Sequence, residues 1–174
     1  SLAFEVLAWD LSDQIDARWL THELATATNA MIAGQVYDTM GGQPDNLAPI
    51  EKLRITHRHK TGALLRASVR MGAIAGSASQ KQIDALSTYA DAIGLMFQAV
   101  DDLLDVTQTA EQVGKATGKD AMQGKLTYPG LLGIDGTRAE IDRLLAEALD
   151  ALTGFDAKAD PLRETAKKLA TREK

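Results

Sequence analysis

Three aspartates at the end of a short apolar stretch carry the clearest chemistry in this sequence. They are Asp101, Asp102 and Asp105, and the segment before them starts at Gly94. Residues 95–106 contain no Gly or Pro and predict a helix, on which Asp101 and Asp105 share one face. Carboxylates one turn apart repel each other, so we expect a positive partner there. Mg²⁺ suits this position, because it prefers oxygen ligands and usually takes one or two protein carboxylates together with phosphate oxygens.

The same predicted helix has an apolar face beside the acids. At the helical period this face holds Ile93, Met96, Phe97, Val100, Leu103 and Leu104. Gly94 and Gln98 fall on the acidic stripe, where a glycine leaves room for a ligand or a neighbouring helix to approach. The alternative to a cation site is a solvated acidic face.

A basic cluster lies in the preceding predicted helix, residues 50–75. It reads His-Arg-His-Lys-Thr-Gly over residues 57–62 and continues with Arg66 and Arg70. Ammonium and guanidinium groups suit phosphate oxygens. In an acidic protein we expect this cluster to complement the acids of the helical stretch 94–105, with a solvated basic face as the alternative.

Two polar pairs on the predicted helices carry weaker signals. Gln35 and Asp38 lie one turn apart late in a helix predicted over 17–40, so they could bond each other or a basic partner, or simply lie at the surface. His57 and His59 lie two apart and point in different directions, so we do not predict them to be metal ligands.

A Gly- and Lys-rich segment, residues 107–125, follows the acidic helix directly. It contains Lys115 and Lys125, each preceded by Gly. A Walker A loop is excluded, because these Gly-Lys pairs have no Gly five positions before them, no Ser or Thr follows the Lys, and a helix precedes the segment instead of a strand. The lysines could fold over a metal-bound phosphate, or they could be ordinary exposed lysines.

Composition and periodicity predict an all-α fold. Of the 174 residues 45% are hydrophobic and only 5% aromatic, as is typical of helical proteins. The predicted helices span residues 17–40, 50–75, 81–106, 128–133, 137–152 and 161–172. Leu144, Leu145, Leu149 and Leu152 form the core side of the fifth of them. No strand candidate is found.

The same composition limits the function classes. The net charge of −5 gives no support to a nucleic-acid partner, and the absence of cysteine excludes disulfides and Cys-bound metal. No apolar run approaches the roughly 20 residues that span a bilayer, and no signal-peptide pattern opens the sequence. We therefore predict a cytoplasmic protein without membrane insertion. Because the sequence enters a helical pattern at once, we expect the natural chain to begin upstream.

Together these features resemble the trans-isoprenyl diphosphate synthases, the polyprenyl synthetase family, and most closely the bacterial farnesyl and geranylgeranyl diphosphate synthases. The resemblance covers essentially the whole sequence. Five motifs occur in the family's order: Gly34-Gln35 with Asp38, residues 59–62, residues 97–105, the lysine loop and residues 125–129. The family's first Asp-Asp-x-x-Asp motif and its following arginines are missing, since residues 2–5 resemble the segment after them. Residues 1–174 are thus interpreted as the C-terminal portion of a single polyprenyl synthetase domain.

The resemblance implies an isoprenoid synthase-type helical bundle around a central cavity, usually in a homodimer. It implies a short-chain prenyltransferase of the dimethylallyltranstransferase or geranyltranstransferase type, forming farnesyl or geranylgeranyl diphosphate. Its substrates would be isopentenyl diphosphate and an allylic diphosphate, and its cofactor Mg²⁺. The implied reaction is ionisation of the allylic diphosphate, attack by the isopentenyl double bond and loss of a proton.

The resemblance also implies roles for individual residues. Asp101 is expected to bind Mg²⁺ directly, and Asp102 and Asp105 directly or through water. The expected diphosphate-binding residues are Lys60, Thr61, Gln98, Lys115 and Lys125. Those expected to act in catalysis are Asp101, Asp102, Lys60 and Lys115.

Other functions share parts of this pattern. A non-catalytic partner or regulatory subunit of a prenyl diphosphate synthase would naturally lack the first motif, but it has no need of an intact second one. A class I terpene cyclase also uses metal-bound diphosphate but has no use for an isopentenyl diphosphate site. A generic helical interaction module would show no Mg²⁺-dependent diphosphate binding.

Overall fold

The helices begin and end where the sequence supplies residues that favour a break. In the computed structural model, which describes residues 2–9, 17–112 and 126–172, α2 (Ala17–Met40) ends before Gly41 and Gly42, whose φ angles of 76° and 89° favour glycine. Helix α3 (Pro49–His57) has proline in its first turn. Helix α7 (Tyr128–Ala151) is capped by Thr127, whose Oγ1 accepts a hydrogen bond of 3.2 Å from the Gly130 amide.

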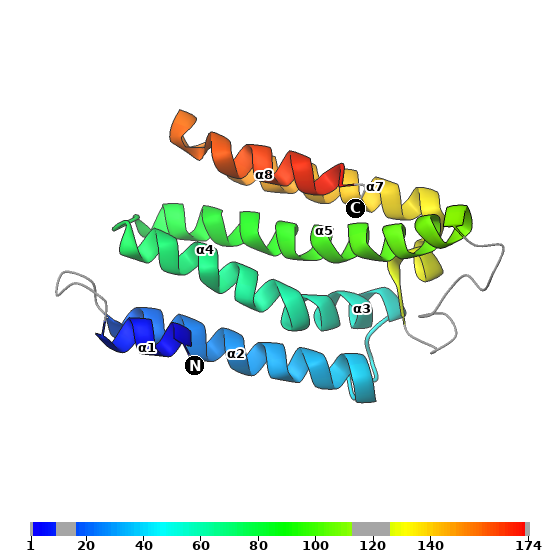
Figure 1. The fold of residues 1–174 in the computed structure, drawn as a ribbon, viewed down its shortest axis with the longest axis horizontal. Coiled ribbons are helices and arrows are strands. Elements are labelled where there is room, and N and C mark those ends of the chain that lie inside the picture. Colours follow the sequence, from blue (N-terminus) through cyan, green and yellow to red (C-terminus); the bar gives the residue numbers. More distant parts are fainter. Residues whose placement is uncertain (1, 10–16, 113–125, 173–174) are drawn as a thin grey trace.

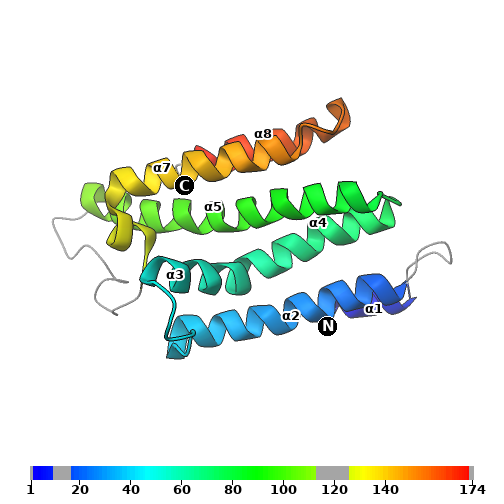
Figure 2. The same cartoon turned by 180° about the vertical axis from the view of Figure 1, so that it is seen from behind.

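The helices stack in layers, with the longest one in the middle (Figures 1 and 2). Helix α5 (Gln80–Gln112) lies between α7 and α8 (Asp160–Ala170) on one side and α3 and α4 (Ala63–Ala75) on the other. Helix α2 forms the outer layer beyond α3 and α4, and α1 (Leu2–Trp9) lies along it. No strand occurs among the described residues, which confirms the all-α prediction.

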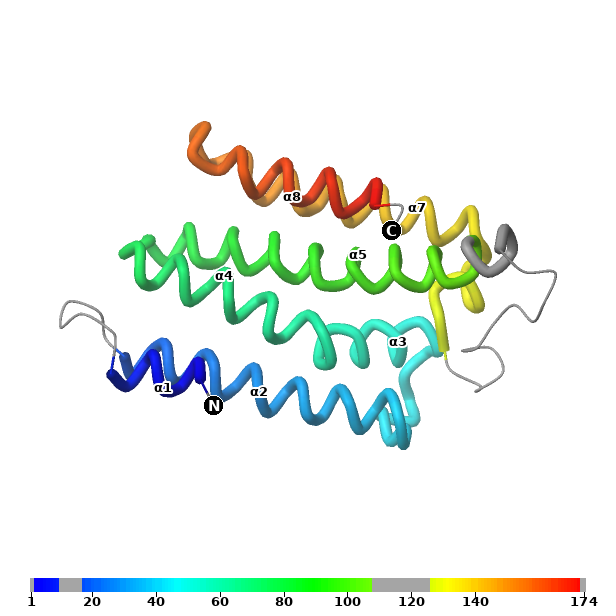
Figure 3. Tube along the Cα trace, viewed as in Figure 1, coloured from blue at the N-terminus to red at the C-terminus, as the bar shows by residue number. Residues whose placement is uncertain are grey.

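The core is built around the predicted apolar face of α5. Met96, Ala99 and Val100 are buried there. From α7, Leu144 and Leu152 are buried, and Leu145 and Leu149 pack against them, so the predicted core side of this helix is confirmed. Helix α8 adds the fully buried Ala166. The tube in Figure 3 shows how α8 runs back along α7 and α5, so that its C-terminal end lies near the middle of α5.

The helices predicted over 128–133 and 137–152 follow each other as α7, and the predicted break between them is confirmed at Gly133, whose φ of 73° and ψ of 172° are not helical. One feature differs from the expectation of regular helices. The helix predicted over 50–75 is interrupted by a π-helical turn, η1 (Arg58–Gly62), which contains the basic cluster. Such wide turns often occur at functional sites.

No helix in the described ranges has both the length and the hydropathy to cross a membrane.

Candidate active site

Two glycine crossings fix the position of the π-helical turn. A Cβ atom on Gly34 of α2 would lie 2.1 Å from the backbone nitrogen of Lys60, and one on Gly94 of α5 would lie 2.7 Å from the Cα atom of Gly62. Both distances are far below van der Waals contact, so only glycine allows this approach. The turn η1 is therefore held against α2 on one side and α5 on the other.

This clamp joins the side chains of three sequence motifs. Lys60 donates a hydrogen bond of 2.8 Å to Asp38 of α2. Thr61 donates one of 2.8 Å to the amide oxygen of Gln98 on α5. Of the alternatives left open for Asp38, a basic partner is the one observed, and its side chain is only 14% exposed. Lys60, Thr61 and Gln98, all predicted to bind diphosphate, lie on this crossing.

Asp101 lies on the same helix and already faces a cation. Arg172, just after α8, donates a hydrogen bond of 2.8 Å to Asp101 Oδ1. Its guanidinium carbon lies 4.9 Å from the centroid of the Phe97 ring, a cation–π contact. The Asp101 side chain is 50% exposed. The positive partner expected at these acids is thus present as an arginine from the far end of the chain.

Asp102 points in another direction from Asp101. Its Oδ2 accepts a hydrogen bond of 2.9 Å from the Tyr128 amide, at the start of α7. His57 Nε2 lies 3.9 Å from the same oxygen. The His57 and Tyr128 rings stack at 5.8 Å with an interplanar angle of 16°. Asp102 therefore ties the acidic helix to the first residue of α7, directly after the lysine segment.

His57 and Tyr128 are both held in their neutral forms. Burial is the main cause that lowers the pKa of His57 to about 4, because a buried site disfavours the charged imidazolium. Burial also raises the pKa of Tyr128 to about 12. Among the described residues, neither ring nitrogen of His57 has a hydrogen-bond partner. The sequence places His57 in the basic cluster without an individual role, although its spacing of one turn from Lys60 places it beside the predicted site.

The remaining basic residues do not complement the acids at the end of α5, contrary to the expectation for this cluster. Arg66 pairs with Asp91 at 3.4 Å, near the start of the helix, and Arg70 pairs with Glu23 of α2 at 2.6 Å. The cause is the packing of α4 against both α2 and α5, which gives Arg70 and Arg66 acidic partners that the pattern of one helix cannot reveal. The different directions predicted for His57 and His59 are confirmed, since His59 Nδ1 bonds the Ile55 carbonyl.

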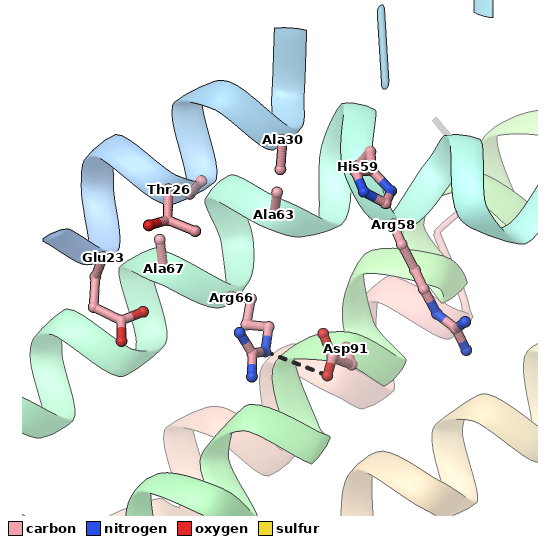
Figure 4. A pocket seen from close by; sticks show the side chains of 10 residues that line it. Glu23, Thr26, Ala30, Arg58, His59, Ala63, Arg66, Ala67 and Asp91 are labelled. Atoms are coloured by element: carbon pink, nitrogen blue, oxygen red, sulfur yellow. Dashed lines mark ion pairs between the residues drawn. The ribbon is translucent and has the colours of Figure 1, made fainter. Parts of the chain in front are cut away.

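A separate cavity of about 250 Å³ lies between α2, η1, α4 and α5 (Figure 4). Alanines such as Ala30 and Ala63 line it, and Arg66 and Asp91 pair at its edge. Among the described residues, none that is predicted to bind metal or diphosphate lines this cavity.

The acids at the end of α5 can supply part of a Mg²⁺ site but not the whole of one. No three Asp, Glu, His or Cys side chains within the described ranges are grouped closely enough to hold a metal by themselves. Asp101 is half-exposed, Asp105 is exposed, and the two lie one turn apart on α5. One or two carboxylates completed by phosphate oxygens and water is the usual Mg²⁺ environment. Lys115 and Lys125, predicted to bind diphosphate, lie outside the described residues.

The bundle places a lysine, a threonine–glutamine pair and a row of aspartates on adjoining helices. Its fold is that of the isoprenoid synthase class. The polyprenyl synthetase family model matches residues 1–161, and the chain belongs to this family.

Curated relatives agree with the assignment. Geranylgeranyl pyrophosphate synthase 11, chloroplastic, of Arabidopsis thaliana is 46% identical over 155 residues, which cover 86% of this chain and 43% of the relative. The heterodimeric geranylgeranyl pyrophosphate synthase large subunit 1, chloroplastic, of the same plant is 42% identical, and the match covers 99% of this chain and 49% of the relative's length. The chain thus spans about half the length of the curated relatives it matches.

Solved structures agree as well. A putative farnesyl-diphosphate synthase from Marinomonas sp. MED121 superposes with a TM-score of 0.77 at 38% identity, over 97% of this chain and 58% of that one. A geranylgeranyl pyrophosphate synthetase from Pyrococcus horikoshii Ot3 has a TM-score of 0.81 over 98% of this chain and 63% of its own; at 23% identity it shows the fold alone.

Proposed function

We propose that the complete protein is a short-chain prenyl diphosphate synthase, which condenses isopentenyl diphosphate with an allylic diphosphate to form farnesyl or geranylgeranyl diphosphate. The proposal includes residues 1–174 as the C-terminal portion of its single catalytic domain. The observation that carries it is the crossing of η1 with α5, where Lys60, the Thr61–Gln98 pair and Asp101 occupy adjoining positions.

The residues of this crossing suit the binding and departure of a diphosphate. Lys60 is oriented by Asp38 and offers further N–H donors to anionic oxygens. The Thr61 hydroxyl gives its proton to the Gln98 oxygen and so orients this amide, whose N–H donors stay available for anionic oxygens. When bound at Asp101 and Asp105, Mg²⁺ would neutralise charge on the diphosphate and so favour its departure. Lys115 and Lys125 are proposed to bind the same oxygens.

The bond changes of the proposed reaction balance without a further reactant. The allylic carbon–oxygen bond breaks, and its electron pair leaves with pyrophosphate. The double bond of isopentenyl diphosphate forms the new carbon–carbon bond. A proton then leaves the isopentenyl unit, with pyrophosphate as the proposed base. Positive groups fixed at the departing anion stabilise the charge that develops in the transition state.

A homodimer is part of the proposal. Large apolar side chains are exposed along the outer layer of the bundle: 84% of Trp9, 54% of Ile32, 44% of Val36 and 83% of Met40. An apolar row of this kind on α1 and α2 supports contact with another protein surface. A cytoplasmic location stays a prediction, because the names of the curated relatives include chloroplastic and mitochondrial proteins.

A condensation assay on the complete encoded protein tests this function. Labelled isopentenyl diphosphate and dimethylallyl diphosphate are supplied with and without Mg²⁺. A Mg²⁺-dependent prenyl product is expected, and its length identifies the synthase. Recovery of intact substrates would contradict the proposal and favour a non-catalytic partner subunit.

A further inference from the structure

Arg172 occupies a position that the proposed function assigns to a metal ion. Its guanidinium is bonded to Asp101 Oδ1 at 2.8 Å and lies over the Phe97 ring. Phe97 and Asp101 are one turn apart on α5, so a single helix face supplies both contacts. The Nε atom of Arg172 is buried without a hydrogen-bond partner among the described residues. The side chain is therefore held over the end of the acidic stripe by two different interactions.

An arginine and a divalent cation on one carboxylate repel each other. Arg172 bonds Asp101 Oδ1, and a Mg²⁺ ion bound to the same side chain would lie within a few ångströms of the guanidinium charge. On the basis of the proposed function, we infer that Arg172 is an internal competitor of the metal at Asp101. Metal binding displaces the guanidinium, and the guanidinium shields Asp101 in the metal-free protein.

The strength of the contact suits a reversible competitor. Asp101 is 50% exposed and Arg172 28% exposed, and ion pairs that exposed are weak. Phe97 adds a cation–π contact of similar modest size. Removal of the competitor is therefore expected to tighten metal binding by about two- to fivefold.

The competition also connects the metal to the end of α8. The amides of Thr171 and Arg172 bond the carbonyls of Lys167 and Leu169 at 3.2 and 3.3 Å, and this turn carries the guanidinium. If Arg172 leaves Asp101 when metal binds, these amides lose an anchor and exchange faster. By linkage, if the Arg172 contact weakens metal binding at Asp101, bound metal must weaken the Arg172 contact by the same factor.

Mn²⁺ binding to the complete protein at a fixed concentration of inorganic pyrophosphate, followed by electron paramagnetic resonance, tests the inference. Arg172→Ala is expected to lower the Kd for Mn²⁺ by about two- to fivefold. The control is Lys168→Ala, which removes the same charge from an exposed position of α8 and should leave the Kd close to that of the wild type. Equal Kd values for wild type and Arg172→Ala, or an equal gain in the control, would overturn it.

Hydrogen exchange provides the second readout. Mn²⁺ is expected to speed exchange at residues 171–172 in the wild type but not in Asp101→Asn. Unchanged exchange at a saturating metal concentration would also overturn the competition. Asp101→Asn separates this failure from that of the proposed function: if this variant binds Mn²⁺ as well as the wild type does, Asp101 is not a metal ligand and the proposed metal site itself fails.

Discussion

Asp101 and Asp102 are neighbours in the sequence, but the helix turns their carboxylates toward different tasks. Asp101 is half-exposed and pairs with Arg172, which suits a group that exchanges one cation for another. Asp102 is only 11% exposed and accepts the Tyr128 amide. A family motif of three acids therefore contains one residue that faces outward and one that also holds the structure together.

This division predicts that the two alanine variants differ in their loss of folding stability. Asp101→Ala is expected to abolish activity of the complete protein at a cost in stability below about 1 kcal/mol, because a half-exposed ion pair is weak and carboxylate repulsion is relieved. Asp102→Ala is expected to cost about 1–3 kcal/mol, because it leaves the amide of buried Tyr128 without its acceptor. Urea unfolding in EDTA measures both, and a larger loss for Asp101→Ala would refute the division.

His57 predicts a pH dependence of stability. Burial holds its pKa near 4 in the folded state, against 6.5 for an ordinary histidine. As the pH falls below about 6.5, the unfolded chain takes up a proton that the folded protein does not, so stability is lost until the pH reaches about 4. The full effect is about 3 kcal/mol.

The variant His57→Phe keeps a ring against Tyr128 but cannot be protonated. Its stability is expected to fall by about 2–3 kcal/mol less than that of the wild type between pH of about 7.5 and 4.5. Urea unfolding of both proteins in EDTA gives this difference directly, so that the titration of other groups cancels. If the free energies of unfolding of the two proteins change with pH in parallel, folded and unfolded His57 take up protons alike, which would contradict the lowered pKa.

Lys60 predicts a kinetic effect. Its side chain is one-third exposed and bonds Asp38 where η1 crosses α2. Hydrogen bonds to charged groups contribute about 1.5–3 kcal/mol, so Lys60→Ala should lower kcat/KM by roughly 10- to 150-fold. Lys81→Ala, at an exposed position of α5, is the control. A loss of less than twofold in Lys60→Ala would remove it from the site.

At the scale of the helices, two glycines determine whether the site can form. Gly34→Ala would place its Cβ on the backbone of Lys60 rather than on a side chain that can move aside. We expect a loss of about 3 kcal/mol or more in the free energy of unfolding, since overpacking against rigid backbone is costly. Gly72→Ala in α4 is the matched control, because its Cβ meets nothing within 4 Å. It should stabilise the protein by about 0.5–1 kcal/mol. Equal effects in urea unfolding would show that the close crossing is not required.

The helices could be predicted from the sequence more completely than the site. The bounds of α2 follow from its periodicity and the two glycines after it, and the buried faces of α5 and α7 follow from their patterns. The π-helical turn could not be predicted, because it depends on contacts with Gly34 and Gly94 rather than on its own residues. The burial of His57 depends on Tyr128, and the cation at Asp101 comes from Arg172. Each of these contacts joins segments that no local pattern relates.

At the scale of the whole molecule, the apolar outer face of α2 leads to the last prediction. Ile32, Val36 and Met40 follow one another at one-turn spacing and are all exposed in this chain. If a second copy covers them in the complete protein, the double variant Ile32→Asp and Val36→Asp should convert a dimer into a monomer, because two unpaired carboxylates would be buried at the contact.

Light scattering after gel filtration measures the mass of each variant. Thr88→Asp, at an exposed position of α5, controls for the added charge. A wild-type monomer would contradict the homodimer itself. A dimer that persists in the double variant, with unchanged helicity, would place the contact elsewhere. Pairing through α2 requires that the double variant lose the dimer while Thr88→Asp keeps it. The reason is that burial of an apolar row stabilises a contact in proportion to the area removed from water.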